Sequence, residues 1–227
     1  MSALDIHLIH RPSIREIAGD VIGPDGRLKI LPASYYKGTT AQERALLGHS
    51  HALYGLHTEE CISWLRDRIA GRSAIEIGAG DGVLAQALGI HATDSYQQAN
   101  PKYKKLYEAA RQPVITYGEN VEKLDAVEAA RRYRPDVIVA CWVTHRYDPG
   151  QHWRGGNEAG VDEAKLLAHC GEYILIGNRD VHRDKPLWPP EELIEPDWLY
   201  SRALNGSPNF IGVWKGARQQ FGRESPP

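Results

Sequence analysis

A glycine-rich turn at residues 76–82 is the part of this sequence whose residue types and spacing could do chemistry. It follows a β-branched run and reads Glu76-Ile-Gly78-Ala-Gly80-Asp-Gly82, after which a helix-like segment begins. Glycines adopt positive φ and let a ligand approach the backbone, and the free N–H groups of a new helix favour an anion or a hydrogen-bond acceptor. The turn therefore predicts a ligand site, with an ordinary tight turn as the alternative.

The next acidic residue at the end of a strand-like segment is Asp94. A carboxylate in that place can accept the hydroxyl protons of a ribose, whereas the alternative is a simple helix cap. A dinucleotide-binding pattern starting at Gly78 needs Gly or Ala at position 83, which is Val83. A frame starting at Gly80 fits that pattern but leaves Gly78 unexplained. The spacing therefore argues against a dinucleotide.

A second candidate for chemistry follows the clearest strand-like run, residues 136–143, where the chain continues Thr-His-Arg-Tyr-Asp. Imidazole titrates near neutral pH, so His145 is the candidate general base, and Tyr147 and Asp148 are further catalytic candidates. The competing interpretation is an exposed loop histidine. Three other histidines at positions 49, 51 and 57 have no Cys or acidic pair of suitable spacing nearby, so no metal is expected.

The elements that must position these residues alternate between strand-like and helix-like patterns. This alternation predicts an α/β fold with a doubly wound, mostly parallel seven-stranded sheet, a C-terminal antiparallel hairpin and an N-terminal arm. The expected strands are 73–77, 91–93, 114–117, 136–143 and 172–176, and the expected hairpin pairs 198–204 with 210–214. The expected helices are 58–70, 83–88, 101–111, 121–133 and 162–169.

Composition limits the class of protein. The 227 residues are 42% hydrophobic and 25% charged and contain no apolar run long enough to span a membrane, so a cytoplasmic protein with no membrane partner is expected. The three cysteines are far apart and are expected as core thiols. The net charge of -2 offers no general attraction to nucleic acid, which favours a small-molecule substrate and leaves nucleic acid or protein acceptors open.

The turn also resembles motif I of the class I S-adenosylmethionine-dependent methyltransferases, Glu/Asp-x-Gly-x-Gly-x-Gly, and the similarity extends over about residues 55–215. The resemblance implies S-adenosylmethionine as cofactor and a methyltransferase as the activity. The residue pattern predicts an arm or cap at 1–56 and a mobile tail at 217–227, and the resemblance implies a cofactor-binding domain at 57–216. The cofactor-binding residues that it implies are Glu76, Gly78, Ala79, Gly80, Gly82, Asp94, Ser95, Tyr96, Glu119 and Trp142.

The resemblance assigns roles to several of these residues. Gly78 and Gly80 would line the methionine part of the cofactor, Asp94 would bind the ribose, and Glu119 and Tyr96 would contact the adenine. No Asn/Asp-Pro-Pro-Tyr follows the fourth strand and no Pro precedes Cys141, so the subfamily and the acceptor stay unidentified. Two alternatives remain, a cofactor-binding module without catalysis and a nicotinamide-dependent oxidoreductase. The oligomeric state is not indicated.

Overall fold

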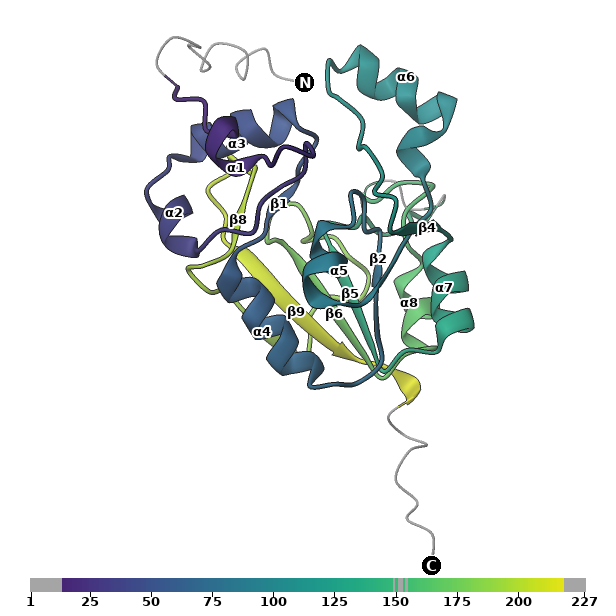
Figure 1. Cartoon of the computed structure of the whole chain (residues 1–227). Coiled ribbons are helices and arrows are strands. Elements are labelled where there is room, and N and C mark those ends of the chain that lie inside the picture. The colour runs from purple at the N-terminus through teal and green to yellow at the C-terminus, as the bar shows by residue number, and fades with distance from the viewer. Residues whose placement is uncertain (1–13, 149, 151–152, 154, 219–227) are drawn as a thin grey trace, which may run out of the picture.

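The centre of the protein is a seven-stranded sheet of order β4-β3-β2-β5-β6-β9-β7, seen in a computed structural model that describes residues 14–148, 150, 153 and 155–218 (Figure 1). The strands are β2 (Ala74–Ile77), β3 (His91–Asp94), β4 (Val121–Lys123), β5 (Val137–Cys141), β6 (Glu172–Asn178), β7 (Glu192–Ile194) and β9 (Asn209–Lys215). Strands β2 to β6 are mutually parallel, whereas β9 is antiparallel to both β6 and β7. This arrangement confirms the predicted fold class.

Helices cover both faces of this sheet. They are α4 (Glu59–Ile69), α5 (Val83–Leu88), α7 (Ala126–Tyr133) and α8 (Glu163–Leu167). Successive side chains of a strand point to opposite faces, so in β5 Val137 and Val139 pack with α4 and α5, while Ile138 and Ala140 pack with α7 and α8. A strand buried on both faces is apolar throughout, which explains why β5 was so clear in the sequence.

The N-terminal arm has a small core of its own. It contains α1 (Ala18–Val21), α2 (Ala33–Lys37) and α3 (Ala41–Ser50), and its buried side chains are Ile17, Val21, Leu28, Tyr36, Leu47 and Leu56. A capping box between Thr40 and Glu43 starts α3. At the end of the arm, β1 (Gly55–Leu56) pairs with β8 (Tyr200–Ser201) in a separate two-stranded sheet. The arm is thereby fastened to a late part of the chain.

Two predicted helices beside the sheet start close to their expected positions. Thr58 caps α4 by accepting a hydrogen bond from the amide of Cys61, and Asp162 caps α8 by accepting one from the amide of Lys165. The chain from β3 continues through the short 3-10 helix η2 (Gln97–Ala99) into α6 (Pro101–Ala109). No helix within the described residues is long and apolar enough to cross a membrane. The predicted mobile tail, apart from residues 217 and 218, lies outside the described residues.

The prediction of a third strand at 114–117 was wrong, and so was the helix start at Val121. That strand pairs with β3 through residues 121–123, and α7 begins only at Ala126. Residues 114–117 have the better strand composition, but in the structure Ile115 and Tyr117 line a cavity instead. The observed strand lies at the edge of the sheet and has the charged residue Glu122 at its centre. Edge strands commonly carry charged residues, so a search for apolar runs does not detect them.

The predicted hairpin partner was also wrong. Strand β9 pairs with β7 at 192–194, and of residues 198–204 only Tyr200–Ser201 form a strand, in the small sheet with β1. The side chain of Asn209 holds the intervening segment, since its Oδ1 accepts from the Ser201 hydroxyl and its Nδ2 donates to the Leu199 carbonyl. The side-chain contacts of Asn209 thus take the place of the backbone hydrogen bonds that would join the two strands of a hairpin.

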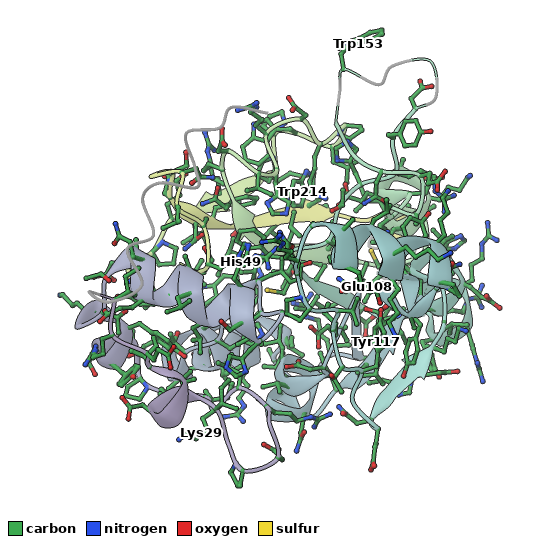
Figure 2. The ribbon with its side chains drawn as sticks, turned by 90° about the horizontal axis from the view of Figure 1, so that it is seen from above. Lys29, His49, Glu108, Tyr117, Trp153 and Trp214 are labelled. Atoms are coloured by element: carbon green, nitrogen blue, oxygen red, sulfur yellow. The ribbon has the colours of Figure 1, made fainter. Side chains whose placement is uncertain are left out.

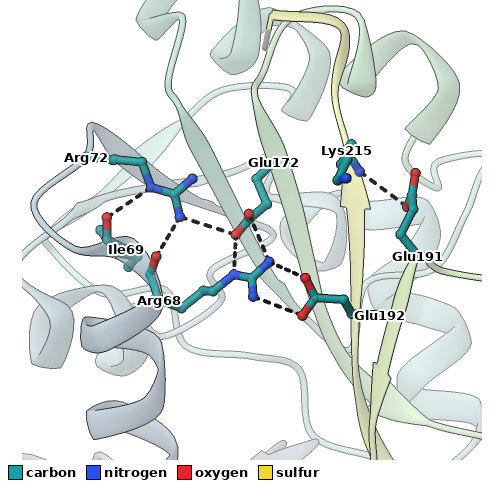
Figure 3. A network of polar contacts seen from close by, with 7 residues as sticks. All are labelled: Arg68, Ile69, Arg72, Glu172, Glu191, Glu192 and Lys215. Carbon is teal, nitrogen blue, oxygen red and sulfur yellow. Dashed lines mark hydrogen bonds and ion pairs between the residues drawn. The ribbon is translucent and has the colours of Figure 1, made fainter.

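The amino-terminal edge of the sheet carries a charge network (Figure 3). Arg68, near the end of α4, donates to both carboxylate oxygens of Glu172 on β6 at 2.9 and 3.1 Å. It also donates to both oxygens of Glu192 on β7 at 2.9 and 2.8 Å. The two carboxylates therefore raise the pKa of Arg68. The network ties one helix to two strands at the edge opposite the glycine turn.

Candidate functional site

The glycine turn leaves the carboxyl end of β2 in a conformation that favours glycine. Gly78, Gly80 and Gly82 have φ of +60°, +57° and +73°. A Cβ at Gly78 would lie 2.5 Å from Cγ1 of Val143, and one at Gly82 would lie 2.6 Å from Cγ2 of Val121. Both the left-handed backbone and the close approach therefore require glycine at Gly78 and Gly82. The turn brings bare backbone to the edge where parallel sheets bind their ligands.

Glu76 is buried beneath this turn. Its Oε2 accepts a hydrogen bond of 2.8 Å from the amide of Ala85, in the first turn of α5. Burial raises the pKa of the Glu76 carboxyl well above its ordinary value, and the charges of Asp81 and Asp94 raise it further. Glu76 therefore holds the helix against the turn and also reaches the cavity above it.

Asp94 is buried and bound to the same turn. Its Oδ2 accepts from the amide of Gly80 at 3.1 Å, and its Oδ1 accepts from the amide of Tyr96 at 2.7 Å. Burial raises the pKa of the Asp94 carboxyl, although both hydrogen bonds act in the opposite direction. A carboxylate has about four acceptor sites, so these two bonds leave capacity for ribose hydroxyls. The ribose role stays a prediction.

A cavity of about 1070 Å³ lies over the turn. Its wall is formed by the turn, by residues 25–28 and 50–55 of the arm, by His57, by residues 113–120 and by Cys141 at the end of β5. Of the residues that the sequence suggested for the cofactor, those on the wall are Glu76, Gly78, Ala79, Gly80 and Glu119. Those not on this wall are Gly82, Asp94, Ser95, Tyr96 and Trp142.

Tyr117 is an aromatic residue on the cavity wall that the sequence did not single out. Tyr96, the residue expected to face the adenine, lies parallel to Tyr117 with the ring centroids 3.9 Å apart. Its hydroxyl donates to the Val121 carbonyl at 2.8 Å. Tyr117 is held in turn, because its hydroxyl accepts from the amide of Gln98. The stack therefore presents Tyr117 to the cavity, with Tyr96 behind it.

Arg27 of the arm clamps the cavity from the other side and was also missed. Its guanidinium donates to the Asp81 carbonyl at 2.7 Å, to Oδ1 of Asn120 at 3.0 Å and to Oε1 of Gln86 at 2.9 Å. These partners are 54 to 93 residues away in sequence. No local sequence pattern could reveal such contacts, so the contribution of the arm to the cavity wall could not be predicted from the sequence.

A second cavity, of about 390 Å³, lies beside the first at the carboxyl edge of the sheet. Trp142 and His145, both singled out from the sequence, are on its wall, and Tyr54 is on the wall of both cavities. His145 is buried against Gly156, where a Cβ would lie 2.8 Å from Nε2 of the imidazole. Tyr147 and the exposed Asp148 are on neither wall. The three catalytic candidates therefore do not converge on one cavity.

The two cavities differ in charge. The wall of the larger one carries four carboxyl groups, those of Asp25, Glu76, Asp81 and Glu119, against the single guanidinium of Arg27. Burial also lowers the pKa of His57 on this wall, which favours its neutral form. The larger cavity is thus suited to a cationic ligand.

Among the described residues, no group of three or more His, Cys, Asp or Glu side chains could hold a metal ion.

Comparison with known proteins gives distant structural likenesses only. No family model and no curated protein matches the chain. The Thermoplasma acidophilum 1320 structure is 17% identical, with a TM-score of 0.37 over 69% of this chain and 88% of that one. TrmN from Thermus thermophilus is 15% identical, with a TM-score of 0.37 over 69% of this chain and 48% of that one. The 23S rRNA methyltransferase ErmE is 14% identical, with a TM-score of 0.35 over 70% and 68%.

Proposed function

We propose that this protein is an S-adenosylmethionine-dependent methyltransferase that acts on a small-molecule acceptor. The observation that carries the proposal is the larger cavity, in which a left-handed glycine turn with Gly78 and Gly80 on the wall meets an excess of carboxyl groups. S-adenosylmethionine has an ammonium and a sulfonium group, both cationic. A nicotinamide dinucleotide has an anionic pyrophosphate, which would face these carboxyl groups at an unfavourable electrostatic cost.

The fit of the cofactor can be argued group by group from the chain. The backbone of Gly78 to Gly80 lies on the cavity wall, and the carboxyl groups of Glu76 and Asp81 are on the same wall. Tyr117 offers an aromatic face for a purine, and Glu119 beside it offers an acceptor for an exocyclic amine. When bound, S-adenosylmethionine supplies a methyl group activated by its positively charged sulfur.

The chain's own contribution to the reaction is alignment of the two molecules. Tyr54 is on the wall of both cavities, and its ring centroid lies 6.2 Å from that of Trp142 on the wall of the second. Gly55 passes close to Cys141 Sγ. Holding two reactants in line at near-attack distance can account for much of the acceleration of a group transfer. His145 on the wall of the second cavity is placed to take a proton from an acceptor that has one to lose.

Isothermal calorimetry tests the proposal directly. S-adenosylmethionine or S-adenosylhomocysteine should bind with a dissociation constant in the micromolar to sub-millimolar range, and NAD or NADP should neither bind nor displace it. A screen of small acceptors, monitored by S-adenosylhomocysteine release, then tests turnover. No binding at millimolar cofactor would overturn the whole proposal. Tight binding without any turnover in a broad screen would favour a binding module without catalysis.

A further inference from the structure

The second cavity has the opposite electrostatic character to the first. None of the residues on its wall is an Asp or a Glu, whereas the wall carries Arg202 and the three histidines His49, His145 and His182. Burial lowers the pKa of His49, and the charge of Arg202 lowers it further. The side chains on this wall can donate hydrogen bonds to an anion, and no carboxylate on the wall competes for them.

Arg202 is held in place without an acidic partner. Its guanidinium carbon lies 3.8 Å from the centroid of the Tyr54 ring, so the side chain is stacked on the residue that separates the two cavities. In the described part of the chain, no ion pair joins Arg202 to a carboxylate. Asp180 lies near the wall residue Asn205, with its Oδ2 3.5 Å from Nδ2 of Asn205, and its other oxygen pairs with Arg183. A stacked guanidinium without a carboxylate partner is well placed to bind an oxyanion.

The rim of the same cavity is apolar. Val181 and Leu204 are on its wall and are 54% and 55% exposed, which is high for aliphatic side chains of this size. The rings of Tyr54 and Trp142 extend this apolar surface inward. His182 is bound to the backbone, because its Nδ1 lies 3.0 Å from both the amide nitrogen and the carbonyl oxygen of Asn178. The wall therefore combines a fixed cationic group with an apolar surface.

We propose that the second cavity binds a small amphipathic anion, a carboxylate or phosphate on an apolar or aromatic body, with Arg202 as the partner of the oxyanion. This inference rests on the proposed function, in which that anion is the methyl acceptor. The volume of about 390 Å³ suits a small molecule of this kind. The inference assigns Arg202 a role in acceptor specificity. In this proposal the cofactor binds in the other, carboxyl-lined cavity.

Calorimetry with simple probes tests the charge preference in the wild-type protein. Benzoate and phenyl phosphate should bind in the presence of S-adenosylhomocysteine, and benzamide, the neutral analogue of benzoate, should bind at least tenfold more weakly. Raising the salt concentration should weaken the binding of both anions. Equal affinity for benzoate and benzamide would overturn the inference. So would competition between benzoate and S-adenosylhomocysteine, because the anion would then occupy the cofactor cavity.

A pair of variants tests the assignment to Arg202. Arg202→Gln should weaken binding of benzoate at least tenfold, and Arg202→Lys by a smaller factor, because lysine keeps the charge but loses the planar double donor. Arg183→Gln is the matched control, since Arg183 is a nearby arginine that is not on the wall, and it should change benzoate affinity less than twofold. An equal loss of benzoate affinity in Arg202→Gln and Arg183→Gln would overturn the assignment.

The same measurements separate this inference from the proposed function. Binding of S-adenosylhomocysteine should be retained in Arg202→Gln, which also shows that the variant folds. Cofactor binding without any anion binding in the wild type overturns the inference and leaves the methyltransferase proposal standing. Anion binding without cofactor binding overturns the methyltransferase proposal, and with it the role of the anion as acceptor.

Discussion

The Glu76 carboxyl should link the stability of the protein to the binding of the proposed cofactor. Because burial raises its pKa above 4.5, the folded state binds this proton more tightly than the unfolded chain does. This group's contribution to the free energy of unfolding is therefore present at low pH and is lost as the pH rises from about 4.5 toward the folded pKa. A cationic cofactor favours the ionised carboxylate, so cofactor affinity should rise over the same range.

Glu76→Gln should remove both pH dependences and keep an acceptor for the Ala85 amide. Urea denaturation and cofactor calorimetry across about pH 5 to 8 check this, with the difference between wild type and variant isolating Glu76 from Asp94 and the histidines. The hypothesis fails if the two proteins show parallel pH profiles in both measurements.

Gly78 and Gly80 should respond differently to the same substitution. Gly80→Ala places a Cβ in ordinary contact with Ile115 at 3.5 Å, so it should cost only the left-handed strain of about 1–2 kcal/mol. Gly78→Ala adds a 2.5 Å contact with the buried Val143, and overpacking should add about 1–3 kcal/mol. Denaturation midpoints measure the difference, and Gly78→Ala with Val143→Ala should recover part of it. A larger loss at Gly80 would contradict this packing argument.

At the scale of elements, the clamp between the arm and the glycine turn should contribute to ligand affinity. Arg27→Ala removes three hydrogen bonds and frees residues 25–28, which form part of the cavity wall, so cofactor binding should weaken about tenfold. Lys29→Ala is the control, since Lys29 is an exposed residue on the same segment (Figure 2) and should have little effect. Calorimetry compares the two, and equal affinities would mean that the arm does not shape the site.

The displaced edge strand can be tested by hydrogen exchange. The amide of Leu124 donates to the Asp94 carbonyl at 2.9 Å, and residues 121–123 pair with β3, so peptides covering 121–125 should be protected without ligand. Peptides covering 113–117 should exchange faster and gain protection when the cofactor is added, because these residues line the cavity. Slower exchange at 113–117 than at 121–125 without ligand would instead support the strand predicted at 114–117.

Local patterns could predict the elements but not their long-range contacts. The inner strands β2, β5 and β6 are mostly apolar and buried, and helix caps such as Thr58 are local signals, so these elements were visible in the sequence. The edge strand β4 was hidden because its central residue is charged. Tyr117, Arg27 and Arg202 were missed because their roles depend on partners brought together only by the fold.

At the scale of the whole molecule, the charge network around Arg68 and the candidate ligand site lie at opposite edges of the sheet. Glu172→Gln should weaken the network with Arg68 and cost about 1–2 kcal/mol, or a few degrees in melting temperature, with cofactor affinity unchanged. Glu195→Gln, which removes an exposed ion pair with Arg179, should cost less than about 0.5 kcal/mol. Melting curves and calorimetry decide this, and a cofactor affinity that falls with Glu172→Gln would show that the two edges are coupled.

A few large hydrophobic side chains are exposed at the surface away from the charge network and the cavities. Trp153 is 78% exposed and points away from the body of the protein (Figure 2). The aromatic rings at the cavities, by contrast, contact one another or a charged side chain, as Tyr54 and Trp142 do. The ring systems that contact ligand in our proposals are thus already ordered by the protein, which reduces the entropy lost on binding.

The place of β9 inside the sheet has a consequence for how the chain is made. Asn209 lies beside Asn178 although it is synthesised 31 residues later, which takes about 2–6 s on a ribosome. During that interval the backbone groups along one side of β6 have no partner, and an unpaired apolar edge is a template for association with other chains. We therefore expect the nascent protein to be exposed to aggregation after its parallel strands have formed and before residues 209–215 emerge.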